Sequence, residues 1–240
     1  DMQSAKLQGY TVYFHNSPEY HTIKREIWGD HVYYLDPVDY PMLDKPGLQI
    51  LDAGAHIGLT TLYYAKIYQE PVITALEPNP VSYRLLEKNI WENQLSGITT
   101  EEVALSDRKG KELLFRDSSG EGWYSTAGFT EGAWNGEQES ERVVVKTQSL
   151  KHYLKRQEWD IIKLDIEGAE GKVLLSAKNE IRKCNHYLIE FHPIGKPTMG
   201  KIVGMLEEKG YLVEVSVGGK VMPWNKARGL SLITATMRNK

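Results

Sequence analysis

Hydrophobic and polar positions change their period repeatedly along the chain from Leu48 onward. Short apolar runs, which predict buried strands, alternate with segments whose apolar residues have helical spacing. The strand and helix pairs are LQILDAG with LTTLYYAKIYQ, VITALEP with PVSYRLLEKNIWEN, WDIIKLDIEG with AEGKVLLSAKNEIRK, and HYLIEFHP with TMGKIVGMLEEKG. Because the strands are apolar nearly throughout and helices separate them, the pattern predicts a parallel sheet with helices on both faces.

The C-terminal segment breaks this alternation. YLVEVSV and LSLITATM read as strands with glycines between them and no intervening helix. We therefore expect an antiparallel hairpin that closes one edge of the sheet. The fold class expected is α/β and Rossmann-like, with a mostly parallel sheet of seven strands.

Two segments lie outside the pattern. Residues 1–47 are rich in Tyr, His and Pro and alternate weakly, which predicts an N-terminal cap of short strands and turns, as in GYTVYFHN and DHVYYLD. The main domain then spans residues 48–240. Residues 116–141 hold five glycines and six acids with no helix or strand period, and their rings favour a mobile lid over the acceptor rather than a linker: Trp123, Tyr124, Phe129 and Trp134.

Composition narrows the class of protein. The 240 residues carry a formal net charge of -3, so nucleic acid is not an expected partner. No apolar run is long enough for a membrane helix, and nothing near Asp1 reads as a signal peptide. Cys184 is the single cysteine and is expected to pack as a small apolar residue. We expect a cytoplasmic protein that does not bind membranes; its oligomeric state cannot be inferred.

The turn after the first strand of the domain is the strongest local signal. Asp52, Gly54, His56 and Gly58 fall between a strand and a helix, where the glycines permit a tight turn and close helix approach. A polar group, such as the methionine carboxylate of S-adenosylmethionine, can bind at that helix N-terminus. A dinucleotide site would require a second glycine where His56 stands. The alternative interpretation is an ordinary glycine turn.

Two further parts of the sequence extend the expected cofactor site. Glu77 ends the next strand, where a carboxylate can accept hydrogen bonds from both ribose hydroxyls, although it could simply start the following helix. The stretch EEVALSD follows another strand, and there the adenine could meet the backbone of Ala104 and Leu105 together with Ser106 or Asp107. Equally, Ser106 and Asp107 could form a turn.

Four polar residues follow two later strands and form the candidate reaction centre. Asp165 and Glu167 end one strand, and Glu190 and His192 end the next, so they should converge where ligands bind in parallel α/β sheets. His192 or Asp165 is expected to remove the proton of the acceptor hydroxyl. Alternatively, Asp165 and Glu190 could hold Mg²⁺; we favour the metal-free base because no third acid is evident.

Each of these residues also has a structural interpretation. Asp165 could accept hydrogen bonds from backbone amides at the strand end. Glu167 could cap the following helix, and Glu190 could pair with Lys163.

Several of these stretches together resemble the FkbM-type methyltransferases, over roughly residues 20–195. The matching stretches are ILDAGAHIGLTTLYYA, ALEPNP, VALSD, WDIIKLDIEGAEGKVL and LIEFHP, of which KLDIEGAE is the most specific. The resemblance implies a class I methyltransferase fold and an S-adenosylmethionine-dependent O-methyltransferase. It also implies that Asp52, Gly54, Glu77 and the Asp165 region lie near the cofactor and reaction centre. His56 departs from the family, in which Asn is common.

The function expected is therefore methylation of a hydroxyl on a sugar or another small-molecule natural product, with S-adenosylmethionine as cofactor. No Asn-Pro-Pro-Tyr-like tetrapeptide follows the strands to suggest methylation of a planar nitrogen. Two alternatives remain from the residues alone: an NAD-dependent oxidoreductase and a non-catalytic nucleotide-binding module.

Overall fold

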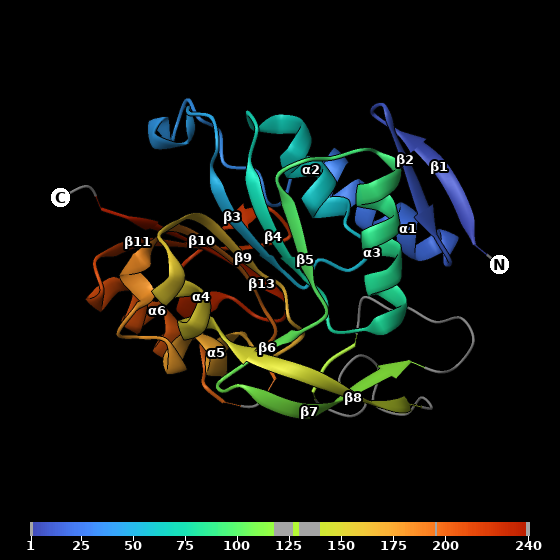
Figure 1. Cartoon of the computed structure of the whole chain (residues 1–240). Coiled ribbons are helices and arrows are strands. Elements are labelled where there is room, and N and C mark those ends of the chain that lie inside the picture. The colour runs from blue at the N-terminus through green and yellow to red at the C-terminus, as the bar shows by residue number, and fades with distance from the viewer. Residues whose placement is uncertain (1, 118–126, 130–139, 195, 239–240) are drawn as a thin grey trace.

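The chain is built around one large mixed sheet in the computed structural model, which describes residues 2–117, 127–129, 140–194 and 196–238 (Figure 1). The strand order is β12-β11-β13-β10-β9-β3-β4-β5, and the five strands from β10 to β5 in this order are parallel. Their bounds are β3 Gln49–Ala53, β4 Val72–Leu76, β5 Ile98–Glu101, β9 Trp159–Leu164 and β10 Cys184–Phe191. The predicted parallel α/β core is confirmed.

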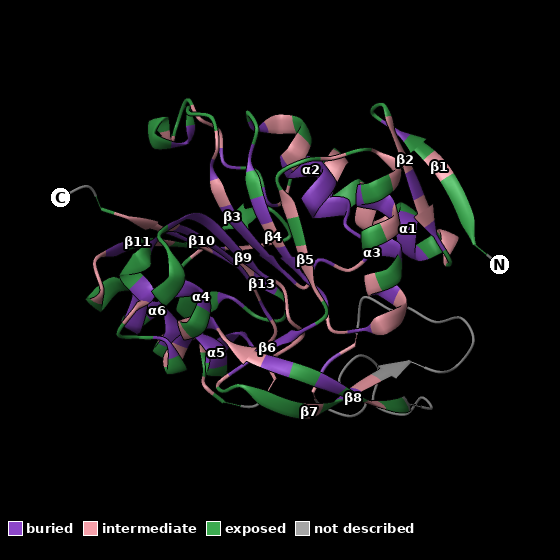
Figure 2. Cartoon of the chain, in the orientation of Figure 1, coloured by how far each residue is buried: buried purple, intermediate pink, exposed green. Residues whose placement is uncertain are grey.

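Helices cover both faces of this sheet, which explains why its strands are apolar throughout. On one face lie α2 (Leu59–Ile67) and α3 (Pro80–Glu92) with the N-terminal segment; on the other lie α4 (Leu150–Arg156), α5 (Glu170–Ser176) and α6 (Met199–Glu208). Consecutive strand residues point to opposite faces of the sheet. Ile161 therefore packs in the core under α2 and the N-terminal segment, and Ile162 packs in the core under α4, α5 and α6. All six residues of β9 are buried (Figure 2).

The C-terminal strands differ in position from the expected edge hairpin. Strand β13 (Ser231–Met237) lies between β10 and β11 (Tyr211–Val217) and is antiparallel to both. The short β12 (Lys220–Val221) forms the edge and brings the sheet to eight strands instead of seven. The reason is that β13 satisfies the open backbone edge of β10, for example by pairing Thr234 with Leu188.

The N-terminal segment contains more helix than expected. After the hairpin of β1 (Gln3–Leu7) and β2 (Tyr10–Phe14) come α1 (Ser17–Lys24), a π-helical turn η1 (Arg25–Gly29) and a 3-10 turn η2 (Pro41–Leu43). Helix α1 begins at Asn16, whose side chain accepts the backbone N–H of Glu19 at 2.9 Å. DHVYYLD, residues 30–36, forms no strand, because its buried side chains pack on α2 as an irregular segment.

The insert region contains two strands that the sequence pattern did not reveal. Strands β7 (Gly110–Asp117) and β8 (Ser140–Ser149) pair antiparallel, and β8 also pairs with β6 (Ala104–Ser106). Positions 116–117 and 140–141 therefore belong to strands, so the expectation of a structureless loop is wrong there. Gly128 bridges to Phe115, and Phe129 packs against the core. Trp123, Tyr124 and Trp134 lie outside the described residues, as does most of the expected lid.

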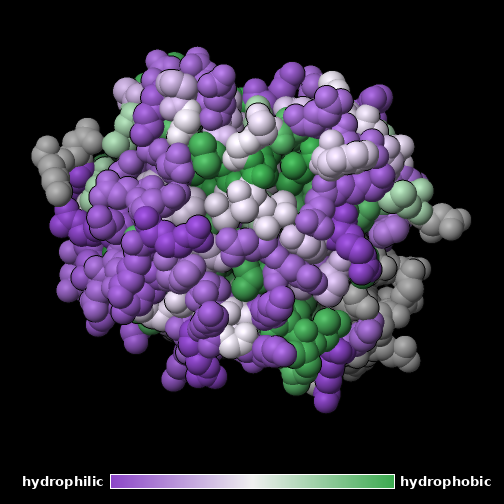
Figure 3. Space-filling model, in the orientation of Figure 1, coloured by the Kyte–Doolittle hydropathy of each residue, from purple (hydrophilic) through white to green (hydrophobic). Residues whose placement is uncertain are grey.

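The outer face of this small sheet is partly apolar. Figure 3 shows apolar surface along the lower edge of the molecule, where β7 and β8 lie in Figure 1. Leu113 and Val144 belong to these strands and are 45% and 64% exposed. Within the part of the chain that the structure describes, no helix is long and apolar enough to cross a membrane.

Candidate active site

A cavity of about 1050 Å³ opens at the carboxyl ends of the parallel strands. Its wall also includes nine residues between Thr22 and Tyr33 of the N-terminal segment and part of the C-terminal strands. Nine of the thirteen sequence-predicted site residues line it: Gly54, His56, Glu77, Ala104, Leu105, Asp165, Glu167, Glu190 and His192. The other four, Asp52, Gly58, Ser106 and Asp107, do not line it.

The loop after β3 is shaped by two glycines with left-handed backbone. Gly54 has φ +76°, and a Cβ built there would lie 1.7 Å from the backbone oxygen of Asp165. Gly58 has φ +93° and precedes α2; a Cβ there would lie 2.8 Å from Leu86 Cδ1 of α3. Any side chain at Gly54 would thus separate the loop from Asp165, whereas Gly58 serves helix packing and not the cavity wall.

Asp52 lies beneath the cavity floor, so the expected direct contact with the cofactor is not supported. Its carboxylate is fully buried, accepts the Thr61 hydroxyl at 2.7 Å and lies 3.3 Å from the Lys163 ammonium. Lys163 also donates to the Gly54 oxygen at 2.7 Å and lies 3.5 Å from Asp165 Oδ2. Asp52 therefore acts through Lys163, a cavity residue that the sequence interpretation considered only as a partner of Glu190.

Glu77 is fixed by the backbone at the end of β4. Its two carboxylate oxygens accept the N–H groups of His56 and Asn79, each at 2.8 Å. Burial raises the pKa of Glu77 to about 7, although these two hydrogen bonds act in the opposite direction. Each oxygen keeps lone-pair capacity for a ligand hydroxyl, so the geometry suits the ribose contact expected from the sequence.

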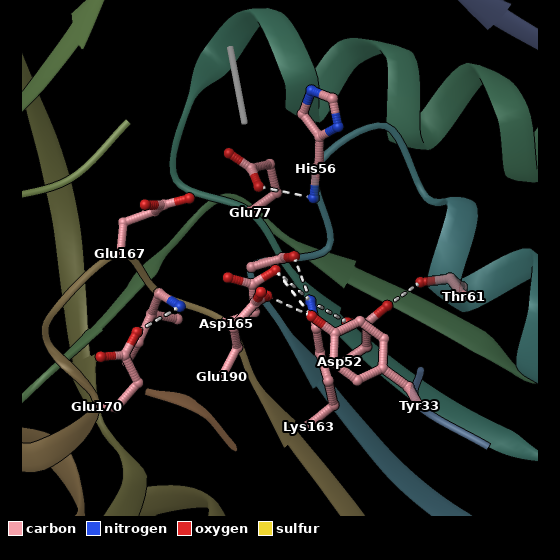
Figure 4. Close-up of polar contacts among 12 residues, drawn as sticks. Tyr33, Asp52, His56, Thr61, Glu77, Lys163, Asp165, Glu167, Glu170 and Glu190 are labelled. Atoms are coloured by element: carbon pink, nitrogen blue, oxygen red, sulfur yellow. Dashed lines mark hydrogen bonds and ion pairs between the residues drawn. The ribbon is translucent and has the colours of Figure 1, made fainter. Parts of the chain in front are cut away.

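The imidazole of His56 turns away from Glu77, as Figure 4 shows. Its Nε2 lies 3.6 Å from Glu19 Oε1 of α1, which connects the cofactor loop to the N-terminal segment. Burial lowers the pKa of His56 despite the nearby Glu19. His56 therefore offers its backbone N–H to Glu77, and its ring forms part of the contact with α1.

The stretch after β5 divides into two halves. Ala104 and Leu105 line the cavity, which fits the expected adenine wall. Ser106 donates to Glu112 and to Asp107, and Asp107 pairs with Lys172 at 3.3 Å. These side chains already have protein partners outside the cavity. Ser106 is the last residue of β6, and Asp107 begins the bend after it, so the turn interpretation fits Asp107 but not Ser106.

Two carboxylates meet at the hydroxyl of Tyr33 (Figure 4). Tyr33 donates to Glu190 Oε2 at 2.5 Å and lies 3.3 Å from Asp165 Oδ2. Burial and the nearby Asp165 raise the pKa of Glu190 to about 8. Sequence reasoning missed Tyr33, since it lies 132 positions before Asp165 in an irregular segment. Its aromatic neighbours carry no signal that would have singled it out.

His192 forms a second polar group with two glutamates. Its Nδ1 lies 3.0 Å from Glu170 Oε1, and its Nε2 lies 3.3 Å from Glu167 Oε2. Although burial alone would lower the pKa of His192, its hydrogen bond and charge interaction with Glu170 raise the pKa to about 10. The ring is therefore cationic at neutral pH, which counts against His192 as the acceptor of a proton.

Glu170, not Glu167, accepts hydrogen bonds from the backbone N–H groups before α5. Glu170 Oε1 accepts the N–H groups of Ile166 and Gly168 at 3.1 and 3.0 Å. Sequence reasoning missed Glu170, although the second acid of the Glu-Gly-Ala-Glu block was a signal that could have found it. Glu167 instead faces the cavity, and burial and Asp165 raise its pKa to about 8.

A divalent ion would find a different ligand group from the expected one. Among the described residues, ligand atoms of Asp165, Glu167 and His192 lie within 4.8 Å of one another. Glu190, which the sequence analysis paired with Asp165 as a metal ligand, is not part of this group. Glu167 supplies the third polar ligand, which was not evident from the sequence. In the structure these three groups neutralise one another in part, because His192 pairs with Glu167.

Solved structures share the fold. The magnesium protoporphyrin IX methyltransferase of Synechocystis PCC 6803, solved with bound SAM, matches with a TM-score of 0.50 and 11% identity over 92% of this chain and 83% of the other. An SAM-dependent methyltransferase from Agrobacterium tumefaciens matches with a TM-score of 0.50 and 12% identity over 98% of this chain and 70% of the other. These similarities confirm the class I methyltransferase fold.

Sequence relatives carry the assignment further. The chain is 30% identical over 224 residues to methyltransferase sdnD of Sordaria araneosa, covering 79% of this chain and 81% of the relative. It is also 30% identical over 102 residues to the 31-O-demethyl-FK506 methyltransferase FkbM of Streptomyces tacrolimicus, covering 42% of this chain and 37% of the relative. The model of the methyltransferase FkbM domain matches residues 52–213. The chain therefore belongs to the FkbM methyltransferase family.

Proposed function

We propose that this methyltransferase transfers the methyl group of S-adenosylmethionine to a hydroxyl of a sugar or another small-molecule natural product. The observation that carries the proposal is the direct contact between the Gly54 turn and the backbone of Asp165. Asp165 N donates to Ala53 O at 3.1 Å, and Gly54 leaves no room for a side chain against the Asp165 oxygen. The cofactor loop and a cavity-facing carboxylate are thereby held side by side.

The residues around this turn fit the cofactor. The carboxylate of Glu77, fixed by two backbone donors, would accept the ribose hydroxyls, and Ala104 and Leu105 would flank the adenine. When bound, S-adenosylmethionine supplies a methyl group on a positively charged sulfur, which is electrophilic without further activation. The protein must then align the acceptor and remove its proton.

Asp165 is the base that the geometry favours. It is partly exposed to the cavity, and its Oδ2 lies 3.5 Å from the Lys163 ammonium. His192 is held as a cation by Glu170, and Glu190 is engaged by Tyr33. The bound cofactor would supply its methyl group to the acceptor oxygen and keep the electron pair of the broken carbon–sulfur bond as a neutral thioether. Asp165 would accept the hydroxyl proton, so that the acceptor leaves as a methyl ether.

Calorimetry with S-adenosylmethionine and S-adenosylhomocysteine tests the cofactor arm without any acceptor. Methyl transfer is tested with S-adenosylmethionine that carries a labelled methyl group and with a panel of sugars and alicyclic alcohols. Mass spectrometry detects the methyl ether that forms. Asp165→Asn should reduce transfer about 10²- to 10⁴-fold, the usual contribution of a positioned base. Asp39→Asn, an exposed acid of the N-terminal segment, is the matched control.

Three outcomes would decide against parts of the proposal. Absence of binding by both cofactor forms would remove the cofactor site. Methylation only of amines or carbon atoms would contradict the proposal that the acceptor is a hydroxyl. Loss of activity on chelation with recovery in Mg²⁺ would replace the metal-free base by a metal-assisted one.

A further inference from the structure

Carboxylates outnumber permanent cations in the cavity wall. Among the described residues that line the cavity, the permanent cations are Arg25 and Lys163. Six acids line the same cavity. Glu77 lies on the proposed cofactor side, and the other five surround the remaining space: Glu26, Asp30, Asp165, Glu167 and Glu190. The acceptor side of the cavity therefore carries more carboxyl groups than cationic groups, even when the protonated His192 is counted with Arg25 and Lys163.

Acids behind the wall also contact the cations that lie next to these carboxylates. Lys163 lies 3.3 Å from Asp52, and His192 Nδ1 lies 3.0 Å from Glu170. Asp52 and Glu170 are fully buried and do not line the cavity. Lys163 also lies 3.5 Å from Asp165, and His192 Nε2 lies 3.3 Å from Glu167, so each cation is shared between a wall acid and an acid behind the wall. The acids of the wall are therefore neutralised only in part by these two cations.

The mouth of the cavity extends this charge outward. Glu26 belongs to η1, and Asp30 follows it at the end of that turn; both are exposed. Burial raises the pKa of Glu26, and Arg25 lowers it, while Asp165 and Asp30 raise it further. Glu26 therefore lies within electrostatic reach of both the inner acid Asp165 and the mouth acid Asp30, with Arg25 as the opposing charge.

Apolar side chains complete the acceptor wall and set the shape of a ligand. These residues are Ile23, Ile27, Val32, Phe129, Ile194 and Leu232. A ring with apolar faces can pack against them while its substituents reach the carboxylates. This combination favours a compact alicyclic or sugar-like frame rather than an extended polar chain.

We infer that the acceptor is a hydroxyl compound that carries a protonated amine, and that the same cavity rejects acceptors with an anionic group. The inference rests on the proposed function. Two unit charges a few ångströms apart interact more strongly near a protein surface than in bulk water, so the sign of one substituent strongly changes affinity. An ammonium group gains this attraction from the wall acids, and a carboxylate or phosphate meets repulsion of the same size.

The test compares three ring alcohols of similar size: trans-2-aminocyclohexanol, trans-1,2-cyclohexanediol and trans-2-hydroxycyclohexanecarboxylate. Their binding to the full chain saturated with S-adenosylhomocysteine is measured by chemical-shift titration in low and high salt. We expect the amino alcohol to bind at least about tenfold more tightly than the carboxylate, in line with the Coulomb interaction above. Salt should narrow this difference because the mouth charges are exposed.

Two variants locate the effect. The double variant Glu26→Gln with Asp30→Asn should reduce the advantage of the amino alcohol over the diol. Asp39→Asn, which removes an exposed acid outside the cavity wall, should leave all three affinities unchanged. Both changes are conservative and lie at exposed positions, so folding should be preserved.

Equal response to the amino alcohol and the carboxylate, including no response to either, overturns the inference. So does an advantage of the amino alcohol that disappears when 1 mM Mg²⁺ is added, roughly the concentration at which weak oxygen-ligand sites fill, because the acids would then hold a metal ion. Binding of S-adenosylhomocysteine is measured first by calorimetry. Its absence would count against the proposed function, whereas its presence without charge preference would count against this inference alone.

Discussion

The hydroxyl of Tyr33 donates a hydrogen bond of 2.5 Å to Glu190 Oε2, although the two residues lie 157 positions apart. Tyr33 is itself held in place: Tyr64 donates to its backbone oxygen at 3.3 Å, and its ring lies over the Lys163 ammonium. The N-terminal segment thus contributes directly to the candidate reaction centre, and Tyr33 orients the acid next to Asp165.

Loss of this hydroxyl should slow methyl transfer. In Tyr33→Phe, measured above pH 8 where Glu190 is ionised, the carboxylate loses its donor, and a hydrogen bond to a charged group is worth about 1.5–3 kcal/mol. The expected result is a roughly ten- to hundredfold lower kcat with the best acceptor of the alcohol panel, and an unchanged Kd for S-adenosylhomocysteine. Tyr68→Phe is the control, because Tyr68 donates to Leu35 O at 3.1 Å and contacts neither carboxylate. Equal kcat values in the two variants would leave Tyr33 without a role in the reaction.

Removal of the Glu77 carboxylate should weaken cofactor binding. Glu77→Ala loses the group proposed to accept the ribose hydroxyls, and charge-assisted hydrogen bonds of this kind are worth about 1.5–3 kcal/mol. Calorimetry should show a roughly ten- to hundredfold higher Kd for S-adenosylhomocysteine, whereas Glu102→Ala, an exposed acid near the end of β5, should bind normally. Unchanged affinity in a folded Glu77→Ala protein would remove the ribose assignment.

The same site should give the cofactor affinity a pH dependence. Burial raises the pKa of Glu77 to about 7, and the ionised carboxylate is the better acceptor. Affinity should therefore be highest above pH 7 and fall as the pH drops through 7. The dependence should be absent in Glu77→Ala, and a curve of the same shape in both proteins would assign the titration to another group.

A methyl group at Gly54 should disrupt the site far more than one at a matched glycine. Gly54 and Gly47 have φ values of +76° and +71°, but a Cβ at Gly54 would lie 1.7 Å from the Asp165 oxygen, whereas Gly47 has open space. Left-handed backbone costs a residue with a Cβ about 1–2 kcal/mol. Urea unfolding of Gly47→Ala should show that loss alone; Gly54→Ala should lose more and fail to bind S-adenosylhomocysteine. Similar behaviour of the two variants would contradict the steric argument.

His192 should stabilise the fold only while it is protonated. Its folded pKa of about 10, raised by Glu170 against the effect of burial, lies above the ordinary value of 6.5. Stability from this group is therefore complete below pH 6.5 and is lost as the pH rises through about 10. The difference in free energy of unfolding between wild type and His192→Gln should shrink over that range. In the Glu170→Gln background the same comparison should be nearly flat.

Much of the architecture follows from local features of the sequence. The period of apolar residues identifies β3, β4, β9, β10 and the helices that follow them, because each strand must bury both of its faces. The loop at Gly54 and the carboxylate at Glu77 could also be located, since they stand directly at strand ends. The same argument applies to Asp165, Glu190 and His192.

Tertiary structure alone decided which partner each of these side chains meets. Asp52 stands in the cofactor loop by sequence, yet it is buried beneath the floor because Lys163 and Thr61 surround it there. His192 is a cation because Glu170 approaches it from α5, and Glu190 is engaged because Tyr33 folds back across the sheet. Spacing along the chain cannot encode such contacts, because they depend on how helices and an irregular N-terminal segment pack over the strands, for Tyr33 across 132 and 157 positions.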